Sequence, residues 1–289
     1  MKRLLLSLLV VFVLQGISDV WAHGTENFSR TNKRPQKREQ RKTGQGFAEN
    51  SVIAHRGAWK AKKLPTNSIA SLRQAMKLGV FGSEFDIHET ADGVLVVNHD
   101  DTFNGLTIEK TNYADLLKFK LSNGEPIPTL EHYIQTGMTQ HRTHLIAELK
   151  PSIISKERSI ELANKVVAMV QRLHAQDWVI YISFSYDILK RIHELEPNAR
   201  LMPLQKSANI QEMKADGMWG IDFYFGAFKK NPELVEVAHS NGLKVNAWTV
   251  DKPEVMDKLL RQGVDFITTN EPEMLLKKVA QRKKAAKKK

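Results

Sequence analysis

Two acidic residues stand two positions apart in a short apolar segment of this 289-residue chain. Residues two apart on a β-strand point the same way, so Glu84 and Asp86 would lie side by side. Adjacent carboxylates repel each other unless a proton or a cation compensates. Glu148, in another apolar segment, would supply a third carboxylate. The set predicts one divalent cation, Ca²⁺ or Mg²⁺, on oxygen ligands; solvated acids or ion pairs with Arg56 and Lys150 are the alternative.

Two histidines are the candidate acid and base. His55 ends the first apolar segment, and His99 precedes Asp100 and Asp101, either of which could orient its ring. Because imidazole exchanges a proton near neutral pH, the pair could serve both the attack on a substrate and the departure of an alkoxide. A single buried histidine bonded to a carbonyl is the alternative for each. The sequence does not distinguish the acid from the base.

Two cations and three aromatic residues complete the candidate site. Arg56 and Lys150 stand beside the acidic and histidine positions, and their charges match the oxygens of a phosphate. A metal, two histidines and two cations around one pocket predict cleavage of a phosphodiester. Aromatic side chains would wall that pocket, with core packing as the alternative: Trp248, Tyr224 and Phe184.

The elements that must position these residues alternate along the chain. Short apolar segments predict strands at Val52–His55, Ser83–Ile87, Thr143–Leu149, Trp178–Ile182, Arg200–Leu204, Gly220–Tyr224, Lys244–Trp248 and Asp265–Thr268. Helical periodicity lies between them at Asn67–Leu78, Glu157–Leu173, Tyr186–Leu195, Ile210–Lys214, Pro232–Ser240, Pro253–Gln262 and Pro272–Val279. Eight βα units predict a parallel (β/α)8 TIM barrel, with an open doubly wound sheet as the alternative. The carboxylates, cations and aromatic residues would then meet at the C-terminal ends of the strands.

Several helix boundaries are marked, and one connection is too long for a single helix. Glycines follow three helix ends and prolines stand in three first turns: Gly79, Gly242 and Gly263, then Pro232, Pro253 and Pro272. Residues 88–142, between the second and third strands, are predicted to be an insertion over one end of the barrel. This insertion should hold an extra strand at Val94–Asn98.

The net charge of +11 belongs to the ends of the chain. Residues 1–50 carry +5 and residues 277–289 carry +8, which leaves −2 for the body. No aromatic residues are interleaved with the basic ones at either end, so no nucleic-acid partner is expected. Weak contact of the basic tail with an anionic surface is compatible with this pattern. The absence of cysteine excludes disulfides, thiolate metal sites and a cysteine nucleophile.

The N-terminus has the organisation of a secretory signal. Lys2 and Arg3 precede an apolar run over residues 4–14, and Val20-Trp21-Ala22 offers a cleavage site. The run is about half of the ~20 residues that span a bilayer, so we expect cleavage after Ala22 and no stable membrane insertion. The expected protein is exported, periplasmic or secreted. Its parts are a signal peptide (1–22), a flexible basic leader (23–50), a barrel (51–280) and a basic tail (281–289).

Motifs spread over residues 51–276 resemble the glycerophosphodiester phosphodiesterase family. They are VIAHRG followed by PTNSIASLRQA, then GSEFDIHETADGVLVVNHD, AELKP, VNAWTVD and GVDFITTNEP. The combination is specific, whereas each motif alone is weak. Thr66 stands where the family usually has Glu, and Asn270 stands where it has Asp in its late motif.

The resemblance implies a barrel that hydrolyses glycerophosphodiesters to an alcohol and glycerol 3-phosphate with a divalent cation. By matching position, it implies catalysis by His55 and His99, phosphate contacts from Arg56 and Lys150, and a glycerol site walled by Trp248. It implies metal ligation by Glu84, Asp86 and Glu148. Two other functions are alternatives: a phospholipase acting on intact membrane lipid, and a non-catalytic binder of anionic envelope polymers through the basic ends. The sequence leaves the physiological diester and the oligomeric state open.

Overall fold

The computed structural model describes residues 46–205 and 209–286. The predictions for the signal peptide, its cleavage site and most of the leader fall on residues outside these ranges and stay predictions. Among the described residues, no helix combines the length and the apolar character needed to cross a membrane.

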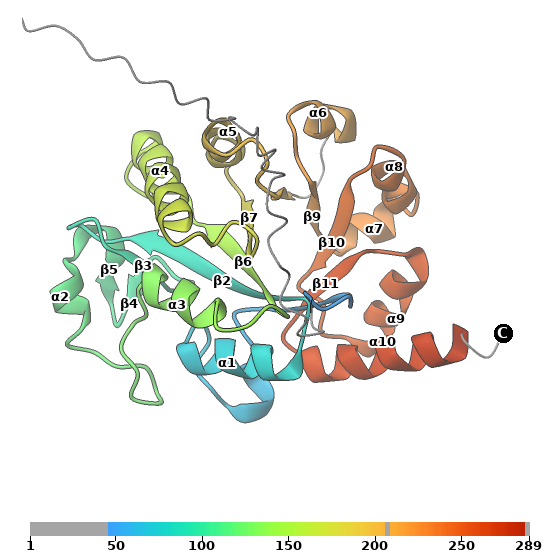
Figure 1. The fold of residues 1–289 in the computed structure, drawn as a ribbon, viewed down its shortest axis with the longest axis horizontal. Coiled ribbons are helices and arrows are strands. Elements are labelled where there is room, and N and C mark those ends of the chain that lie inside the picture. The colour runs from blue at the N-terminus through green and yellow to red at the C-terminus, as the bar shows by residue number, and fades with distance from the viewer. Residues whose placement is uncertain (1–45, 206–208, 287–289) are drawn as a thin grey trace, which may run out of the picture. The chain divides into compact units, whose positions relative to one another are not determined.

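Eight parallel strands close into a barrel (Figure 1). In spatial order they are β1 (Val52–Ala54), β11 (Phe266–Thr269), β10 (Lys244–Trp248), β9 (Gly220–Tyr224), β8 (Leu201–Gln205), β7 (Val179–Ser183), β6 (His144–Leu149) and β2 (Gly82–Glu89). β1 pairs with both β11 and β2, so the sheet has no free edge there. The predicted TIM barrel is confirmed and the open sheet is excluded. Every predicted strand is present, with ends that differ by no more than two residues.

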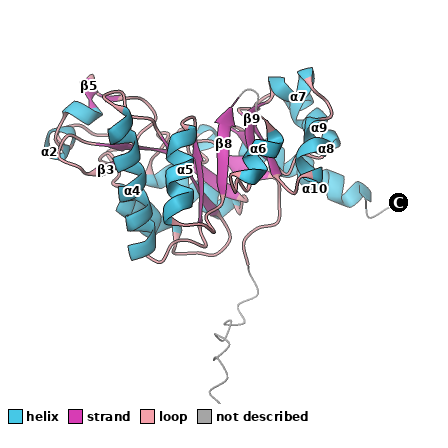
Figure 2. Ribbon diagram, turned by 90° about the horizontal axis from the view of Figure 1, so that it is seen from above, coloured by secondary structure: helices cyan, strands magenta, loops and turns pink. Residues whose placement is uncertain are grey.

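Helices follow the barrel strands and cover their outer surface (Figure 2). Their bounds are η1 Lys60–Lys62, α1 Ile69–Leu78, α4 Lys156–Arg172, α5 Tyr186–Leu195, α6 Ile210–Ala215, α7 Gly226–Lys230, α8 Leu234–Ser240, α9 Pro253–Gln262 and α10 Pro272–Ala286. α1 begins two residues later than predicted because Ser68 and Ser71 form a reciprocal cap, and it ends at Gly79, whose φ of 66° suits glycine.

Two helix predictions differ from the structure near the C-terminal half of the barrel. The segment predicted as Pro232–Ser240 is preceded by a separate helix, α7, and α8 begins only at Leu234, so Pro232 lies before the helix rather than in its first turn. α10 continues beyond the predicted Val279 to Ala286. Gln, Lys, Arg and Ala in this stretch are strong helix formers, which accounts for the extension.

The connection between β2 and β6 contains several small elements. They are β3 (Leu95–Val97), β4 (Thr102–Phe103), β5 (Leu106–Thr107), η2 (Ile108–Lys110), α2 (Tyr113–Leu116) and α3 (Leu130–Gly137). β3 is the predicted extra strand, and it pairs antiparallel with the C-terminal end of β2. Figure 1 shows α2, β4 and β5 grouped at one side of the barrel. His99 lies just after β3, so this pairing brings it toward the strand ends.

Two apolar layers determine where polar groups can lie. The larger core lies between strands and helices. A smaller cluster fills the barrel interior: Ile53, Ile146, Ile180, Ile182, Met202, Leu204 and Phe266. At the N-terminal ends of the strands, Phe47 stacks on His144 at 3.8 Å between ring centroids. The interior below is thus filled, and the chemistry is confined to the C-terminal ends.

Candidate active site

A tight turn after β1 presents the first pair of site residues. Arg56 and Gly57 both have positive φ, at 54° and 81°. A side chain at Gly57 would collide with Ser71 of α1, which accounts for the glycine. The turn directs the Arg56 backbone N–H at Glu84 Oε2, to which it donates a hydrogen bond of 2.8 Å. The main chain of the turn after β1 is therefore bonded directly to the Glu84 side chain of β2.

The three predicted carboxylates meet. One carboxylate oxygen from each of Glu84, Asp86 and Glu148 lies within 4.8 Å of the others, and all three residues are buried. The register of β2 and β6 explains this. Asp86 pairs with Glu148, and Glu84, two residues before Asp86, lies on the same face of β2. Glu84 Oε1 is buried and has no hydrogen-bond partner among the described residues.

Burial and crowding disfavour the charged forms of Glu84 and Glu148. Burial, with Asp86 and Glu148 adding repulsion, raises the pKa of Glu84 well above its usual range. Burial and Asp86 raise the pKa of Glu148 to about 7, despite the nearby Lys150. Three buried acids with an orphaned oxygen form a donor set that a hard divalent cation would satisfy.

Two cations and one amide contact the carboxylates. Lys150 Nζ lies 2.9 Å from Glu148 Oε1 and 3.3 Å from Asp86 Oδ1. Arg56 Nε is 3.9 Å from Asp86 Oδ2. Asn67 Nδ2 donates to that same oxygen at 2.8 Å. Asp86 therefore contacts both cations and the amide, whereas Glu84 and Glu148 line the pocket.

His55 is held by a chain of side chains that determines which ring nitrogen carries its proton. Asn270 Nδ2 donates to Asp251 Oδ2 at 2.8 Å, and Trp59 Nε1 donates to Asn270 Oδ1 at 3.2 Å. These two bonds fix the amide orientation, so Asn270 Oδ1 accepts from His55 Nδ1 at 2.9 Å. His55 Nε2 is left with its lone pair, 3.9 Å from Glu84 Oε2. Burial and the Arg56 charge lower the pKa of His55 to about 4, so the ring is neutral.

His99 has a different environment. Its Nδ1 lies 2.6 Å from Asp100 Oδ1, and its side chain is 37% exposed. The hydrogen bond from His99 holds the pKa of Asp100 below its usual value, so this carboxylate is charged. The backbone carbonyl of His99 accepts from the buried His88 Nε2 at 3.4 Å. His88 lies on the same face of β2 as Glu84 and Asp86. The sequence analysis did not single it out, although the two-residue alternation of a strand places it on that face.

The aromatic residues form a group around Trp248. Phe184 packs edge-on against Trp248 at 5.5 Å, and Tyr224 packs on it at 5.8 Å. Trp248 Nε1 donates to the backbone carbonyl of Asp222 at 3.0 Å, which fixes the indole. Trp248 and Phe184 line the pocket, but Tyr224 does not. Tyr224 supports Trp248 instead of forming a wall of its own.

One cavity of about 170 Å³ contains most of the predicted residues. Its lining is His55, Arg56, Glu84, His99, Glu148, Lys150, Ile182, Phe184, Leu204, Asp222, Trp248, Thr249 and Thr268. Asp86 lies behind this lining within the carboxylate cluster.

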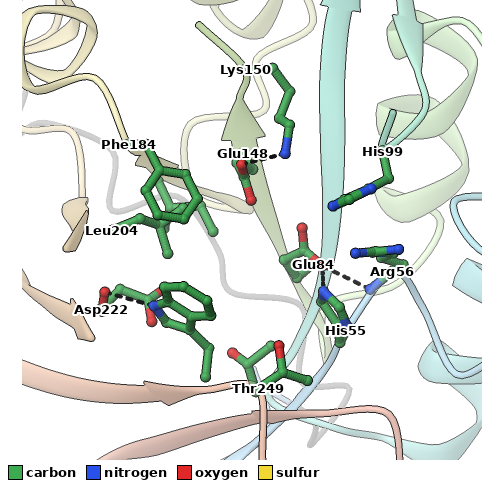
Figure 3. Close-up of a pocket in the computed structure, with 13 residues that line it drawn as sticks. His55, Arg56, Glu84, His99, Glu148, Lys150, Phe184, Leu204, Asp222 and Thr249 are labelled. Atoms are coloured by element: carbon green, nitrogen blue, oxygen red, sulfur yellow. Dashed lines mark hydrogen bonds and ion pairs between the residues drawn. The ribbon is translucent and has the colours of Figure 1, made fainter. Parts of the chain in front are cut away.

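The pocket has a charged side and a largely uncharged side. In Figure 3, His55, Arg56 and His99 lie on one side, with Glu84 and Glu148 between, and Phe184 and Leu204 lie opposite. The charged side comes from β1, β2, β6 and the segment after β3, and the other side comes from β7 to β11. The sequence reasoning identified the charged side but missed most of the opposite wall, whose members carry no distinctive spacing: Ile182, Leu204, Asp222, Thr249 and Thr268.

Together, the closed parallel barrel and this pocket of acids, histidines and cations define a barrel hydrolase of phosphoric diesters. The sequence profile of the glycerophosphoryl diester phosphodiesterase family matches residues 55–274. A glycerophosphodiester phosphodiesterase of Caldanaerobacter subterraneus is 32% identical over 242 residues, covering 78% of this chain and 96% of that protein. The chain therefore belongs to the glycerophosphoryl diester phosphodiesterase family.

Solved structures agree with this assignment. A crystal structure of a glycerophosphodiester phosphodiesterase from Parabacteroides distasonis has a TM-score of 0.78 and 39% identity, covering 82% of this chain and 99% of that one. An Oleispira antarctica phosphodiesterase, solved with its product sn-glycerol 3-phosphate, has a TM-score of 0.70 and 26% identity, covering 78% and 95%. The barrel and the enzyme class are thus shared with proteins of known structure.

Proposed function

We propose that this enzyme hydrolyses small glycerophosphodiesters to an alcohol and glycerol 3-phosphate at a carboxylate-bound divalent cation. One observation carries the proposal: a cluster of three buried carboxylates, with the unpartnered Glu84 Oε1, presents Glu84 and Glu148 to a single small cavity that two histidines and two cations also line. The product found in the Oleispira antarctica relative supports glycerol 3-phosphate as the product here.

Glu84, Asp86 and Glu148 are the residues that would hold the cation. Their oxygen ligands suit Ca²⁺ or Mg²⁺. A bound cation would polarise a phosphoryl oxygen and neutralise charge that develops on it. Binding would also relieve the repulsion that raises the pKa of Glu84.

Arg56 and Lys150 are proposed to bind the phosphate. The Arg56 backbone N–H donates to Glu84, and the side chains of Arg56 and Lys150 line the cavity. A guanidinium offers paired donors to phosphate oxygens, and an ammonium adds a compact charge. The two cations would orient the diester and stabilise its transition state.

His55 is proposed as the general base. Its Nδ1 hydrogen is committed to Asn270, so Nε2 is the nitrogen that can accept a proton in the pocket. A neutral ring is required for that role, and burial keeps it neutral. His55 would take the proton from the attacking group as its oxygen bonds to phosphorus.

His99 is proposed as the general acid. The carboxylate of Asp100 accepts from Nδ1, so Nε2 is the ring nitrogen left for a proton transfer to the substrate. As the phosphorus–oxygen bond to the alcohol breaks, His99 would give its proton to the leaving oxygen. The two rings thus have different partners, an amide oxygen at His55 and a carboxylate at His99, and the proposal assigns them different roles on that ground.

A coupled assay for glycerol 3-phosphate tests the proposal. Glycerophosphocholine, glycerophosphoethanolamine and glycerophosphoglycerol would be supplied with Ca²⁺, Mg²⁺ or EDTA. We expect glycerol 3-phosphate from at least one diester, loss of turnover in EDTA and recovery on addition of one cation. Turnover that survives exhaustive chelation would contradict the metal site, and free glycerol with a head-group phosphate would contradict the cleavage direction.

Cleavage of intact lipid is a second candidate because apolar side chains are exposed beyond the ends of two barrel strands. Ile153 and Ile154 after β6 are 51% and 48% exposed, and Phe184 after β7 is 47% exposed. The small cavity favours a water-soluble diester over a lipid. Phosphatidylcholine vesicles in the same assay separate the two: hydrolysis of vesicles at a rate similar to that of glycerophosphocholine would favour the lipid.

A further inference from the structure

A buried carboxyl lies in the pocket wall opposite the metal cluster. Asp222 on β9 is 1% exposed and lines the cavity. Within residues 46–205 and 209–286, no lysine, arginine or histidine forms an ion pair with it. The mechanism proposed above does not use this side chain. A carboxyl buried without a cation is costly, so its place in a substrate pocket points to a ligand.

One amide holds this carboxyl and a neighbouring hydroxyl. Asn246 Nδ2, on β10, donates to Asp222 Oδ1 at 2.6 Å and to Thr268 Oγ1 at 2.8 Å. Because Thr268 accepts from the amide, it keeps its own hydrogen to donate. Asp222 and Thr268 both line the cavity, so the wall presents an acceptor and a donor from neighbouring positions.

The surroundings select the kind of group that fits. The Trp248 indole is fixed by its bond to the Asp222 carbonyl, and Leu204 lines the same side. A carbon chain would pack on these apolar surfaces, while the polar pair would bond to hydroxyls on it. Arg56 and Lys150 on the charged side attract a phosphate, whereas the described residues of this wall offer it no cation. The substrate should therefore lie with its phosphate toward those cations and its hydroxyls toward Asp222.

The protonation behaviour of Asp222 agrees with a neutral partner. Burial, with a smaller contribution from Glu148, raises the pKa of Asp222 well above its usual range. A carboxyl can bond to a hydroxyl in either protonation state, whereas an ammonium requires the charged form.

We propose that Asp222 and Thr268, positioned by Asn246, recognise the hydroxyls of the glycerol arm of the substrate. The inference rests on the proposed function and adds a contact that distinguishes glycerol from an alkyl chain of equal length. Sites built to bond a hydroxyl discriminate strongly against analogues that lack it, because the buried polar groups are then unpaired.

Binding of three monoesters to the Ca²⁺-loaded full chain, measured by calorimetry, tests the proposal. sn-Glycerol 3-phosphate carries hydroxyls, n-propyl phosphate has the same carbon chain without them, and phosphoethanolamine carries an ammonium. Asp222→Asn should keep the contact with Asn246 through its amide oxygen and replace the other carboxyl oxygen, which can accept in either protonation state, with an NH2 group that can only donate. We expect this substitution to lower the affinity for glycerol 3-phosphate by about 10- to 100-fold. The affinity for propyl phosphate should change by less than about threefold, since this ligand makes no hydroxyl contact.

Two further variants keep the test decisive. Thr268→Val keeps the shape of the side chain and removes its hydroxyl. This variant should lower the affinity for glycerol 3-phosphate selectively, and it tests the proposal even if Asp222→Asn fails to fold. Asp265→Asn is a matched control, because Asp265 accepts from Lys244 Nζ and Val245 N before β11, away from the cavity lining. It should leave the preference for glycerol 3-phosphate over propyl phosphate unchanged.

Three outcomes would overturn the inference. They are equal affinity of the wild type for glycerol 3-phosphate and propyl phosphate, equal weakening of both by Asp222→Asn, and a larger loss for phosphoethanolamine than for glycerol 3-phosphate. The proposed function fails separately, if the wild type binds glycerol 3-phosphate selectively but hydrolyses no diester.

Discussion

Asn270 Oδ1 lies 2.9 Å from His55 Nδ1, so a residue just after the last strand of the barrel determines the proton position on a residue just after the first. β1 and β11 are paired neighbours, which makes this contact between distant parts of the sequence short and direct. Asp251 and Trp59 fix the amide in turn. Asn270 is therefore a positioning residue for the proposed base.

Replacing Asn270 tests this contact. We expect Asn270→Ala to lower kcat by about 10²-fold, the lower range for loss of a positioned acid or base, because His55 can then adopt either tautomer. KM and the midpoint of Ca²⁺ activation should stay within about threefold, since no phosphate or metal contact is removed. Asn270→Asp keeps an acceptor for His55 and should retain more activity than Asn270→Ala. Steady-state kinetics decide this, and equal losses in kcat for both variants would contradict the positioning role.

Removal of one carboxylate tests the metal site. Glu84→Gln removes a charged ligand and relieves repulsion, so we expect it to abolish metal-dependent turnover without unfolding the protein. The wild-type Tm should rise with added Ca²⁺ or Mg²⁺, and the variant Tm should not. Glu109→Gln is the control: Glu109 is also buried, but it accepts from Ser152 and the Ile153 backbone away from the cluster. A Tm response to cation that survives in Glu84→Gln would remove Glu84 from the ligand set.

The histidine roles can be separated by leaving group. His55→Ala and His99→Ala should each lower kcat on glycerophosphocholine by roughly 10²–10⁴-fold. A nitrophenyl ester of glycerol phosphate departs with little protonation, so it should restore much of the activity of His99→Ala and little of that of His55→Ala. The double variant should lose much less than the product of the single losses, because the pair acts as a unit. The reverse rescue pattern would exchange the roles, and wild-type rates in both single variants would make the histidines structural.

Acid should destabilise the protein partly through His144. Burial and Arg200 lower the pKa of His144 to about 3, so the folded protein holds it neutral. The unfolded chain binds this proton below about pH 6.5, so the stability that depends on neutral His144 is present above that pH. It is lost as pH falls toward 3, at up to about 1.4 kcal/mol per pH unit.

Urea unfolding at pH 7.5 and pH 5 measures this effect. His144→Gln should show a smaller loss of unfolding free energy between the two pH values than the wild type. The exposed His132 is the control residue, and His132→Gln should behave like the wild type. Identical pH dependence in His144→Gln and the wild type would exclude His144 as a contributor.

Export stays a prediction from the sequence. Expressed from its full gene in a bacterial host, the protein should be recovered outside the cytoplasm with His23 as its first residue. Mass spectrometry of the purified chain measures this end. An intact N-terminus beginning at Met1 on the recovered protein would contradict cleavage after Ala22.

The sequence predicted the barrel well because local patterns determine most of it. Gly220–Tyr224 and Lys244–Trp248 were predicted with the observed bounds, since short apolar runs of this kind are typical of buried strands. α7 was missed because Gly226–Lys230 is too short to show a helical period. The end of α10 was placed too early because its last apolar residue, Val279, precedes its last helical turns.

The charged half of the site was predictable because its residues are adjacent in short motifs. Glu84 and Asp86, or Glu148 and Lys150, fall two apart on strands, and a barrel then joins the pairs. Asn270 was noted only as a departure within the late motif and Asp222 was not found, because their importance depends on contacts across strands that no spacing in one sequence reveals. Tyr224 was assigned to a wall from its position at a strand end, but its ring packs on Trp248 outside the lining.

The division of the cavity between two arcs of strands has an evolutionary consequence. Apart from the positioning residue Asn270, the proposed reaction groups are encoded by the first half of the gene, up to Lys150, and the wall proposed to meet the remaining arm of the substrate is encoded by the second half. Codon changes at Phe184, Leu204 or Thr249 could therefore alter substrate choice while the hydrolytic apparatus is inherited unchanged. A library for new diesters should be confined to that second arc.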